Sequence, residues 1–361
     1  MRSHFCIQLL FWLVLLSSTS CGGKPGTPTA GTASPTGPTA PQPIAGPPSN
    51  LVVVPQQRNS QGSIYELRWT APSGSVTPFA VEVGSSTRAS DIGVFEAPSS
   101  ATTYSLTTQH RGPVFVRVRA RNAGGLGDPS NEFRIEDQRD VIEALFLSTG
   151  ALRSPDHQPI CQFTSLFPDV VEGFSRGTTV TALLSNSLPE PHKQAAARLF
   201  DDMTAATMGS LQVMRNFSDD RNYMEAAFRR NEFCGTNELV ILDVADGQPF
   251  CGTLGCGGGR LAPRATTALF QNAFVIAQRT DAVFGNSTEA VIAHELSHAV
   301  GLCHIASPIM GEFTLMGTSA IRGVTRLSSV ELAAIRSVYG AGLGPGSTRQ
   351  DLLSSGLVGP R

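Results

Sequence analysis

The chain has 361 residues, long enough for more than one domain with its own hydrophobic core. Its 27 basic and 29 acidic residues give a formal net charge of −2 at pH 7, and there is no run of Lys or Arg. A nucleic-acid-binding protein concentrates positive charge on one face, so no nucleic-acid partner is expected.

The first 20 residues have the pattern of a secretory signal peptide. Arg2 precedes an apolar run over residues 9–16, which is too short to span a membrane, and small polar residues follow. Cys21 and the two glycines after it resemble a bacterial lipobox, in which the cysteine is lipidated and becomes the new N-terminus. Ser18 stands where Leu is most usual, so cleavage and release remain the alternative. We expect an exported protein anchored to the membrane through Cys21, at the bacterial cell envelope or surface.

Residues 21–48 follow as a stretch of Pro, Thr, Gly and Ala with almost no large apolar side chain. Such a composition cannot bury a core. We expect a flexible tether between the lipidated Cys21 and the folded domains.

Residues 49–136 contain short β-type runs separated by turns, the pattern of an antiparallel sandwich. The clearest runs are residues 51–54, 64–69, 80–83 and 114–120. Trp69 with the Thr-Ala-Pro after it, and residues 117–127, resemble a fibronectin type III domain. Val114 departs from that family, which commonly has a packing tyrosine there. The resemblance implies an all-β sandwich, and either a spacer or a module that binds a partner or glycan.

Residues 137–343 are enough for one enzyme domain. Residues 191–208 have helical spacing with Pro at the start, and residues 238–244 and 270–278 read as buried strands. This mixture predicts an α+β domain. Residues 344–361 are expected to be a flexible tail.

The most informative segment is residues 294–304, His-Glu-Leu-Ser-His-Ala-Val-Gly-Leu-Cys-His. His294 and His298 are four residues apart, so on a helix they share one face and can bind the same ion. Gly301 can adopt the positive φ that ends the helix and brings His304 back as a third ligand. Three protein nitrogens leave a tetrahedral Zn²⁺ one open position, as in a catalytic site. Glu295 can reach a water at that position without being a ligand.

These eleven residues resemble the zinc signature of the metzincin metalloproteases. That family has a methionine turn beneath the zinc, for which Met316 is the first candidate and Met310 the alternative. Met316 is favoured because residues 327–340 then resemble the closing helix of the matrixin branch. This helix is also predicted independently, since Ser328 and Glu331 form a capping box before an apolar stripe.

The resemblance implies a zinc metalloendopeptidase that acts on a protein or peptide substrate. Zinc would lower the pKa of its water to about 7, and Glu295 would act as general base and return the proton to the leaving amine. Ca²⁺, which metzincins often bind, is a weaker expectation at Asp243, Asp246 and Gly247, where a simple turn is the commoner explanation.

Two other functions stay open. The sandwich could make the chain a surface binding protein with an inactive or weakly active metal domain, or the zinc site could hydrolyse a non-protein amide. The cysteines agree with export: five remain besides Cys6 and Cys21, so at most two disulfides form within the chain. Cys303 is expected to be buried or disulfide-bonded beside the site, with a thiol that regulates zinc as the alternative.

Overall fold

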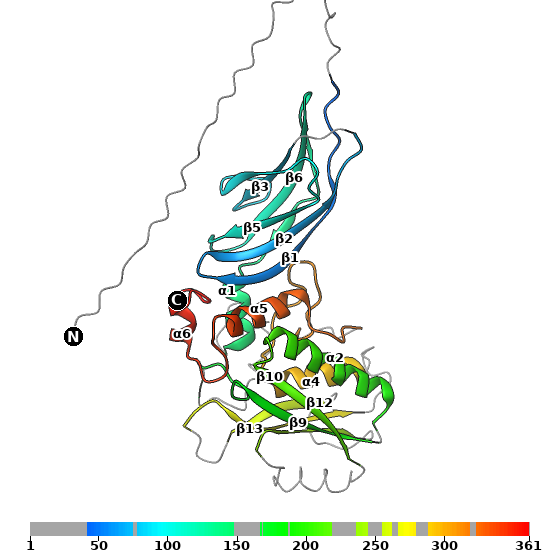
Figure 1. Ribbon diagram of the computed structural model, residues 1–361, viewed down its shortest axis with the longest axis vertical. Helices are drawn as coiled ribbons and strands as arrows, with labels where there is room; N and C mark the ends of the chain where they lie inside the picture. The colour runs from blue at the N-terminus through cyan, green and yellow to red at the C-terminus, as the bar shows by residue number, and fades with distance from the viewer. Residues whose placement is uncertain are drawn as a thin grey trace, which may run out of the picture. The chain divides into compact units, whose positions relative to one another are not determined.

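The computed structural model describes most of the chain after residue 41, and Figure 1 shows a β-sandwich followed by a second part of helices and strands. The described residues are 42–74, 78–147, 167, 169–186, 188–218, 236–244, 255–261, 266–278, 288–317 and 323–360. The expected signal peptide, Cys21 and most of the tether lie outside them. No helix among these residues is both long and apolar enough to cross a membrane.

The first part consists of two antiparallel sheets. One sheet has the order β1-β2-β5, with β1 Ser49–Asn59, β2 Gly62–Thr70 and β5 Thr103–Thr108. The other has the order β4-β3-β6-β7, with β3 Phe79–Gly84, β4 Gly93–Ala97, β6 Val114–Asn122 and β7 Gly125–Pro129. Strand β8, Phe133–Ile135, pairs with the other half of β6. The predicted antiparallel β-sandwich is confirmed by these two sheets of three and five strands.

Alternating side chains explain why these strands form a sandwich. Along β6 every second residue is buried, from Val114 to Ala120, and the residues between them are partly exposed. Trp69 of β2 packs edge-on against Phe79 of β3, with ring centroids 5.4 Å apart. The core therefore lies between the two sheets.

The second part is built on a five-stranded sheet of order β10-β9-β11-β13-β12. Its strands are β9 Thr178–Ser185, β10 Leu211–Ser218, β11 Glu238–Val244, β12 Gly255–Leu261 and β13 Phe270–Gln278. All neighbours are parallel except the edge strand β12, which is antiparallel to β13. The helices α2 (Glu190–Ala206) and α4 (Thr288–Ala299) pack together against this sheet (Figure 1). The α+β organisation is thus present in the structure.

Among the residues that the structure describes, the second part has three further helices. They are α1 Gln138–Phe146, α5 Ser329–Gly340 and α6 Arg349–Ser354. Helix α1 packs on α5, and α5 also packs on the sandwich strand β1. The predicted capping box of Ser328 and Glu331 is present at the start of α5.

The C-terminal residues differ from the expected flexible tail. Thr348 and Asp351 form a capping box at the start of α6, and Thr348 bridges to Val170. Leu352, Leu357 and Val358 are buried. Part of the expected tail is therefore folded, because these three apolar side chains belong to the hydrophobic core.

Candidate metal centre

Helix α4 carries the first two histidines and is buried on most sides, as predicted. Ala290, Ile292, Ala293 and Leu296 have no measurable exposure. The helix ends at Gly301, which has φ of +105° as predicted. Two hydrogen bonds close this end, from the Gly301 N–H to the His298 carbonyl and from the Leu302 N–H to the Ser297 carbonyl, a Schellman arrangement.

Glycine is required at this turn for a second reason. A Cβ at position 301 would lie 2.2 Å from the carbonyl oxygen of Glu172. The chain can therefore turn back toward α4 only with Gly301, and it delivers His304 to the face that carries His294 and His298.

The three histidines meet through their Nε2 atoms. The separations are 2.9 Å between His294 and His304, 3.1 Å between His298 and His304, and 3.2 Å between His294 and His298. Two nitrogens bound to one tetrahedral Zn²⁺, each at 2.0–2.1 Å, would lie roughly 3.3 Å apart. The spacing of the triad is thus close to that of a zinc ligand set.

The tautomers of two histidines support the same fit. The Nδ1 atom of His294 lies 2.7 Å from the Leu315 carbonyl, and that of His298 lies 2.7 Å from the Leu302 carbonyl. A carbonyl only accepts, so both Nδ1 atoms carry the hydrogen and both Nε2 atoms present lone pairs. Facing lone pairs repel unless a cation lies between them. The donor set therefore fits a metal ion better than a hydrogen-bonded cluster.

Burial keeps His294 and His298 in their neutral form, which is the form that binds metals. Burial lowers the pKa of His294, and burial together with the charge of His294 lowers the pKa of His298 to about 3. Both side chains are therefore uncharged at neutral pH.

Glu295 lies on the same helix, beside the edge strand β12. Burial raises the pKa of its carboxyl to about 8, although the Gly257 N–H donates to the carboxylate and opposes the shift. The approach of the two elements is close, since a Cβ at Gly257 would lie 2.0 Å from the Glu295 carbonyl oxygen. A carboxyl with such a pKa can take and release a proton near neutral pH.

Met316 lies in the segment that contacts the triad. It is fully buried, and its carbonyl accepts from the Ile305 N–H, one residue after His304. The preceding residue, Leu315, holds His294. The alternative, Met310, lies in a tight turn with φ of +52°, and among the described residues it has no hydrogen bond to the histidines. These contacts favour Met316 as the methionine-turn residue.

Glu331 is a site residue whose role the sequence did not reveal. Its buried carboxylate accepts from the Leu315 N–H at 3.1 Å and the Met316 N–H at 2.7 Å. It also accepts from the N–H of Ser328 at 2.7 Å and its hydroxyl at 2.8 Å. The capping box of α5 thus also fixes the segment that orients His294. The sequence placed Glu331 only in the predicted capping box with Ser328, and nothing there indicated its bonds to residues 315 and 316.

The comparisons with known proteins concern the sandwich. No protein-family model and no curated protein matches the chain. A solved third fibronectin III domain of the human KIAA0343 protein is 18% identical over 30% of this chain and 93% of that one, with a TM-score of 0.23. A computationally redesigned β-sandwich protein is 22% identical over 25% of this chain and 93% of that one, with a TM-score of 0.22. A titin fragment is 23% identical over 26% of this chain and 32% of that one, with a TM-score of 0.21. Scores this low add nothing to the strand topology described above.

The structure describes only some of the other expected site residues. Cys303 is buried and disulfide-bonded, as the first of its two interpretations predicted. Asp243 lies in strand β11, one residue before its end, whereas Asp246 and Gly247 lie outside the described residues, so the calcium site stays a prediction. The same holds for lipidation of Cys21.

Proposed function

We propose that the chain is a zinc-dependent endopeptidase of the metzincin kind, with a matrixin-like arrangement. The observation that carries the proposal is the convergence of three Nε2 atoms within 2.9–3.2 Å of one another, two of them held as lone-pair donors by backbone carbonyls. His294, His298 and His304 would hold the ion.

The chemistry that zinc supplies in such a site is Lewis acidity, which polarises a carbonyl and lowers the pKa of a water molecule. The protein's own contribution centres on Glu295, which accepts the proton of the attacking water and returns it to the leaving amine. The Gly257 N–H keeps the carboxylate beside β12. The carbonyls of Leu315 and Leu302 keep the imidazoles in the required tautomer.

The edge strand β12 favours a peptide over other amides. Among the described strands it pairs only with β13, so its other edge has no strand partner within that part of the chain. It also lies directly against the residue assigned as the base, Glu295. An extended peptide that adds to this edge would make main-chain hydrogen bonds regardless of its sequence. Its scissile bond would then lie near the histidines.

Zinc content and peptide hydrolysis test this function together. We expect one zinc per chain in the wild type and in Glu295→Gln, with cleavage of casein or a quenched peptide library by the wild type only. His298→Ala should lose both zinc and cleavage. A wild type that holds zinc but cleaves no peptide, and does not differ from Glu295→Gln, would refute the protease. Hydrolysis of small acyl amides in place of peptides would favour a zinc hydrolase of non-protein amides. Binding of a partner by the sandwich, without any hydrolysis, would favour a surface binding protein.

We also propose that the enzyme is exported and anchored through a lipid on Cys21, on the residue pattern of the first 21 positions. Metabolic labelling with a radioactive fatty acid should mark the wild type and leave Cys21→Ser unlabelled. Equal labelling of both, or of neither, would contradict the anchor.

A further inference from the structure

We propose that the sandwich positions the histidine site through helix α5, with Ser337 as the positioning residue. The meaning of this coupling for catalysis rests on the proposed function, but the coupling itself is a property of the fold. On this proposal the sandwich affects the geometry of the histidine site. A sandwich that served only as a spacer would leave that geometry unchanged.

Ser337 joins the sandwich to α5 through a buried hydroxyl. The Arg58 N–H of strand β1 donates to the Ser337 Oγ at 2.7 Å, and this hydroxyl donates to the Ala333 carbonyl at 2.8 Å. Gln138 of α1 also donates to it, at 3.4 Å. Strand β1 is an edge of its sheet, so the Arg58 N–H is free to serve α5. All of these groups are shielded from water, which makes the bonds difficult to replace.

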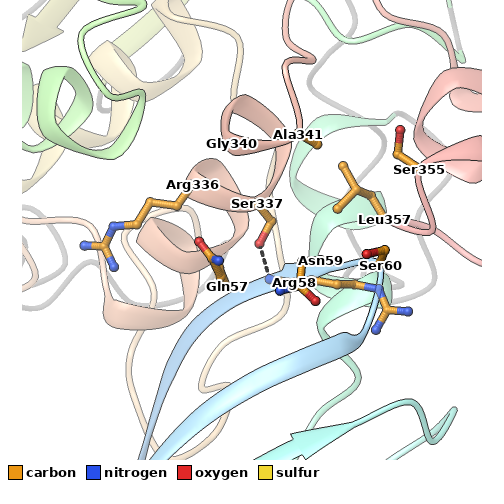
Figure 2. A pocket seen from close by; sticks show the side chains of 10 residues that line it. All are labelled: Gln57, Arg58, Asn59, Ser60, Arg336, Ser337, Gly340, Ala341, Ser355 and Leu357. Atoms are coloured by element: carbon orange, nitrogen blue, oxygen red, sulfur yellow. Dashed lines mark hydrogen bonds between the residues drawn. The ribbon is translucent and has the colours of Figure 1, made fainter. Parts of the chain in front are cut away.

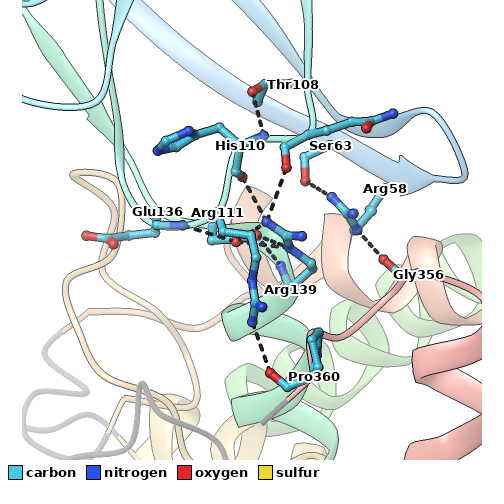
Figure 3. A network of polar contacts seen from close by, with 12 residues as sticks. Arg58, Ser63, Thr108, His110, Arg111, Glu136, Arg139, Gly356 and Pro360 are labelled. Carbon is cyan, nitrogen blue, oxygen red and sulfur yellow. Dashed lines mark hydrogen bonds and ion pairs between the residues drawn. The ribbon is translucent and has the colours of Figure 1, made fainter. Parts of the chain in front are cut away.

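The side chain of Arg58 makes further contacts between the sandwich and the second part of the chain, as Figure 3 shows. Its guanidinium donates to the Gly356 carbonyl and, at 2.9 Å, to the Ser63 hydroxyl. A neighbouring arginine, Arg139 at the start of α1, donates to the His110 carbonyl of the sandwich at 2.9 Å. Arg58 therefore ties strand β1 to the C-terminal segment, and Arg139 ties α1 to the loop after β5, through polar contacts that are at least partly buried.

The contact between strand β1 and helix α5 is not packed solidly. A cavity of about 320 Å³ lies between the tip of β1 and the C-terminal half of α5 (Figure 2). It is lined by residues 57–60 on one side and by Arg336, Ser337, Gly340 and Ala341 on the other. Since side chains do not fill this space, the hydrogen bonds at Ser337 add to the packing between α5 and β1 in fixing how the two elements lie on each other.

The other end of α5 holds the metal centre. Glu331 precedes Ser337 by six residues, roughly 9 Å along a helix. It binds the N–H groups of Leu315 and Met316, and the Leu315 carbonyl binds His294. A helix of this length moves as one body, so a displacement at Ser337 is carried to Glu331 and from there to His294.

A second contact brings the sandwich to the same segment. A Cβ at Gly311 would lie 3.9 Å from the ring of Phe133 in strand β8. Gly311 belongs to the loop between His304 and Met316. The sandwich therefore borders both α5 and the loop that α5 holds.

Hydrogen exchange at the Leu315 and Met316 amides tests the coupling without relying on zinc or catalysis. The full chain carrying Ser337→Ala is compared with Ser130→Ala. Ser130 is a matched control, because its buried hydroxyl also accepts from a strand N–H, that of Val118 at 3.0 Å, and donates to a carbonyl at 2.8 Å. It lies in the sandwich between β7 and β8, and among the described residues neither strand has a hydrogen bond to α5.

We expect both amides to exchange about fivefold faster in Ser337→Ala, relative to the slowest-exchanging amides, the factor equivalent to one typical hydrogen bond. Ser130→Ala should leave this ratio unchanged. Unchanged exchange in Ser337→Ala, or equal acceleration in both variants, would overturn the coupling. If Ser337→Ala does not fold, Arg58→Met is measured in its place. This variant keeps the backbone N–H but loses the Gly356 contact, so we expect a smaller acceleration at the same amides. No acceleration in Arg58→Met would overturn the coupling. Zinc content and peptide cleavage of the wild type, measured separately, decide the proposed function.

Discussion

Replacing Glu331 by Ala should destabilise the protein strongly, because its carboxylate serves three backbone N–H groups at once. Leu315, Met316 and Ser328 would each keep a donor without its acceptor, in a place where Glu331 itself has no exposure. A buried donor left unsatisfied costs about 1–3 kcal/mol. Partial relaxation reduces the sum, so we expect a loss of about 3–5 kcal/mol, a large share of the 5–15 kcal/mol typical of a domain.

The free energy of unfolding from urea denaturation measures this loss, and a second capping box provides the control. Asp351 caps α6 with the same pattern of bonds to Thr348, but it is exposed and holds no other segment. Asp351→Ala should therefore cost much less than Glu331→Ala. In NMR spectra of the Glu331 variant, the ring N–H of His294 should exchange with water faster, whereas that of His298 should not change. Equal losses in the two Ala variants, or a loss below about 1 kcal/mol at Glu331, would refute the reasoning.

Three further outcomes can be measured directly. Gly257→Ala should lower the free energy of unfolding by about 1–3 kcal/mol and slow peptide hydrolysis more than tenfold, because its Cβ would lie 2.0 Å from the Glu295 backbone. The control Gly46→Ala, whose Cβ would have its nearest neighbour at 3.7 Å, should change neither the stability nor the hydrolysis rate. Burial raises the pKa of Glu172 to about 8, so the folded state holds this proton more tightly than the unfolded state. The contribution of Glu172 to the free energy of unfolding is thus complete below about pH 4.5 and is lost as the pH rises toward 8, with a slope of at most about 1.4 kcal/mol per pH unit. Glu172→Gln should flatten the plot of unfolding free energy against pH over this range. Reduction of the disulfide at Cys303, next to the third histidine, should weaken zinc binding about tenfold in a chelator competition, and an unchanged affinity would show that the bond does not support the site.

The parts of the site that the sequence predicted are those set by local rules. His294 and His298 share a helix face because of their spacing, and Gly301 turns the chain because it alone accepts φ of +105° without strain. The sandwich was likewise predictable, since alternation along residues 114–120 determines which side chains face the core.

The parts that could not be predicted depend on contacts between distant segments. Nothing near Glu331 in the sequence indicates that its carboxylate serves residues 15 and 16 positions earlier. The contact between Arg58 and Ser337 spans 279 positions. The tail was misjudged for the same reason, because its apolar residues Leu352 and Leu357 have meaning only beside a core that the rest of the chain builds.

This distinction divides the metal centre itself. His298 receives its orientation from the Leu302 carbonyl, four residues away and inside the eleven-residue motif. His294 receives its orientation from the Leu315 carbonyl, 21 residues away, which in turn depends on Glu331 and α5. The motif is therefore sufficient to identify the three candidate ligands, but only one of these two imidazoles is fixed by the motif alone. The geometry of His294 is a property of the whole fold, so variants remote from the motif, at Glu331 or Ser337, should act on the site through this one histidine.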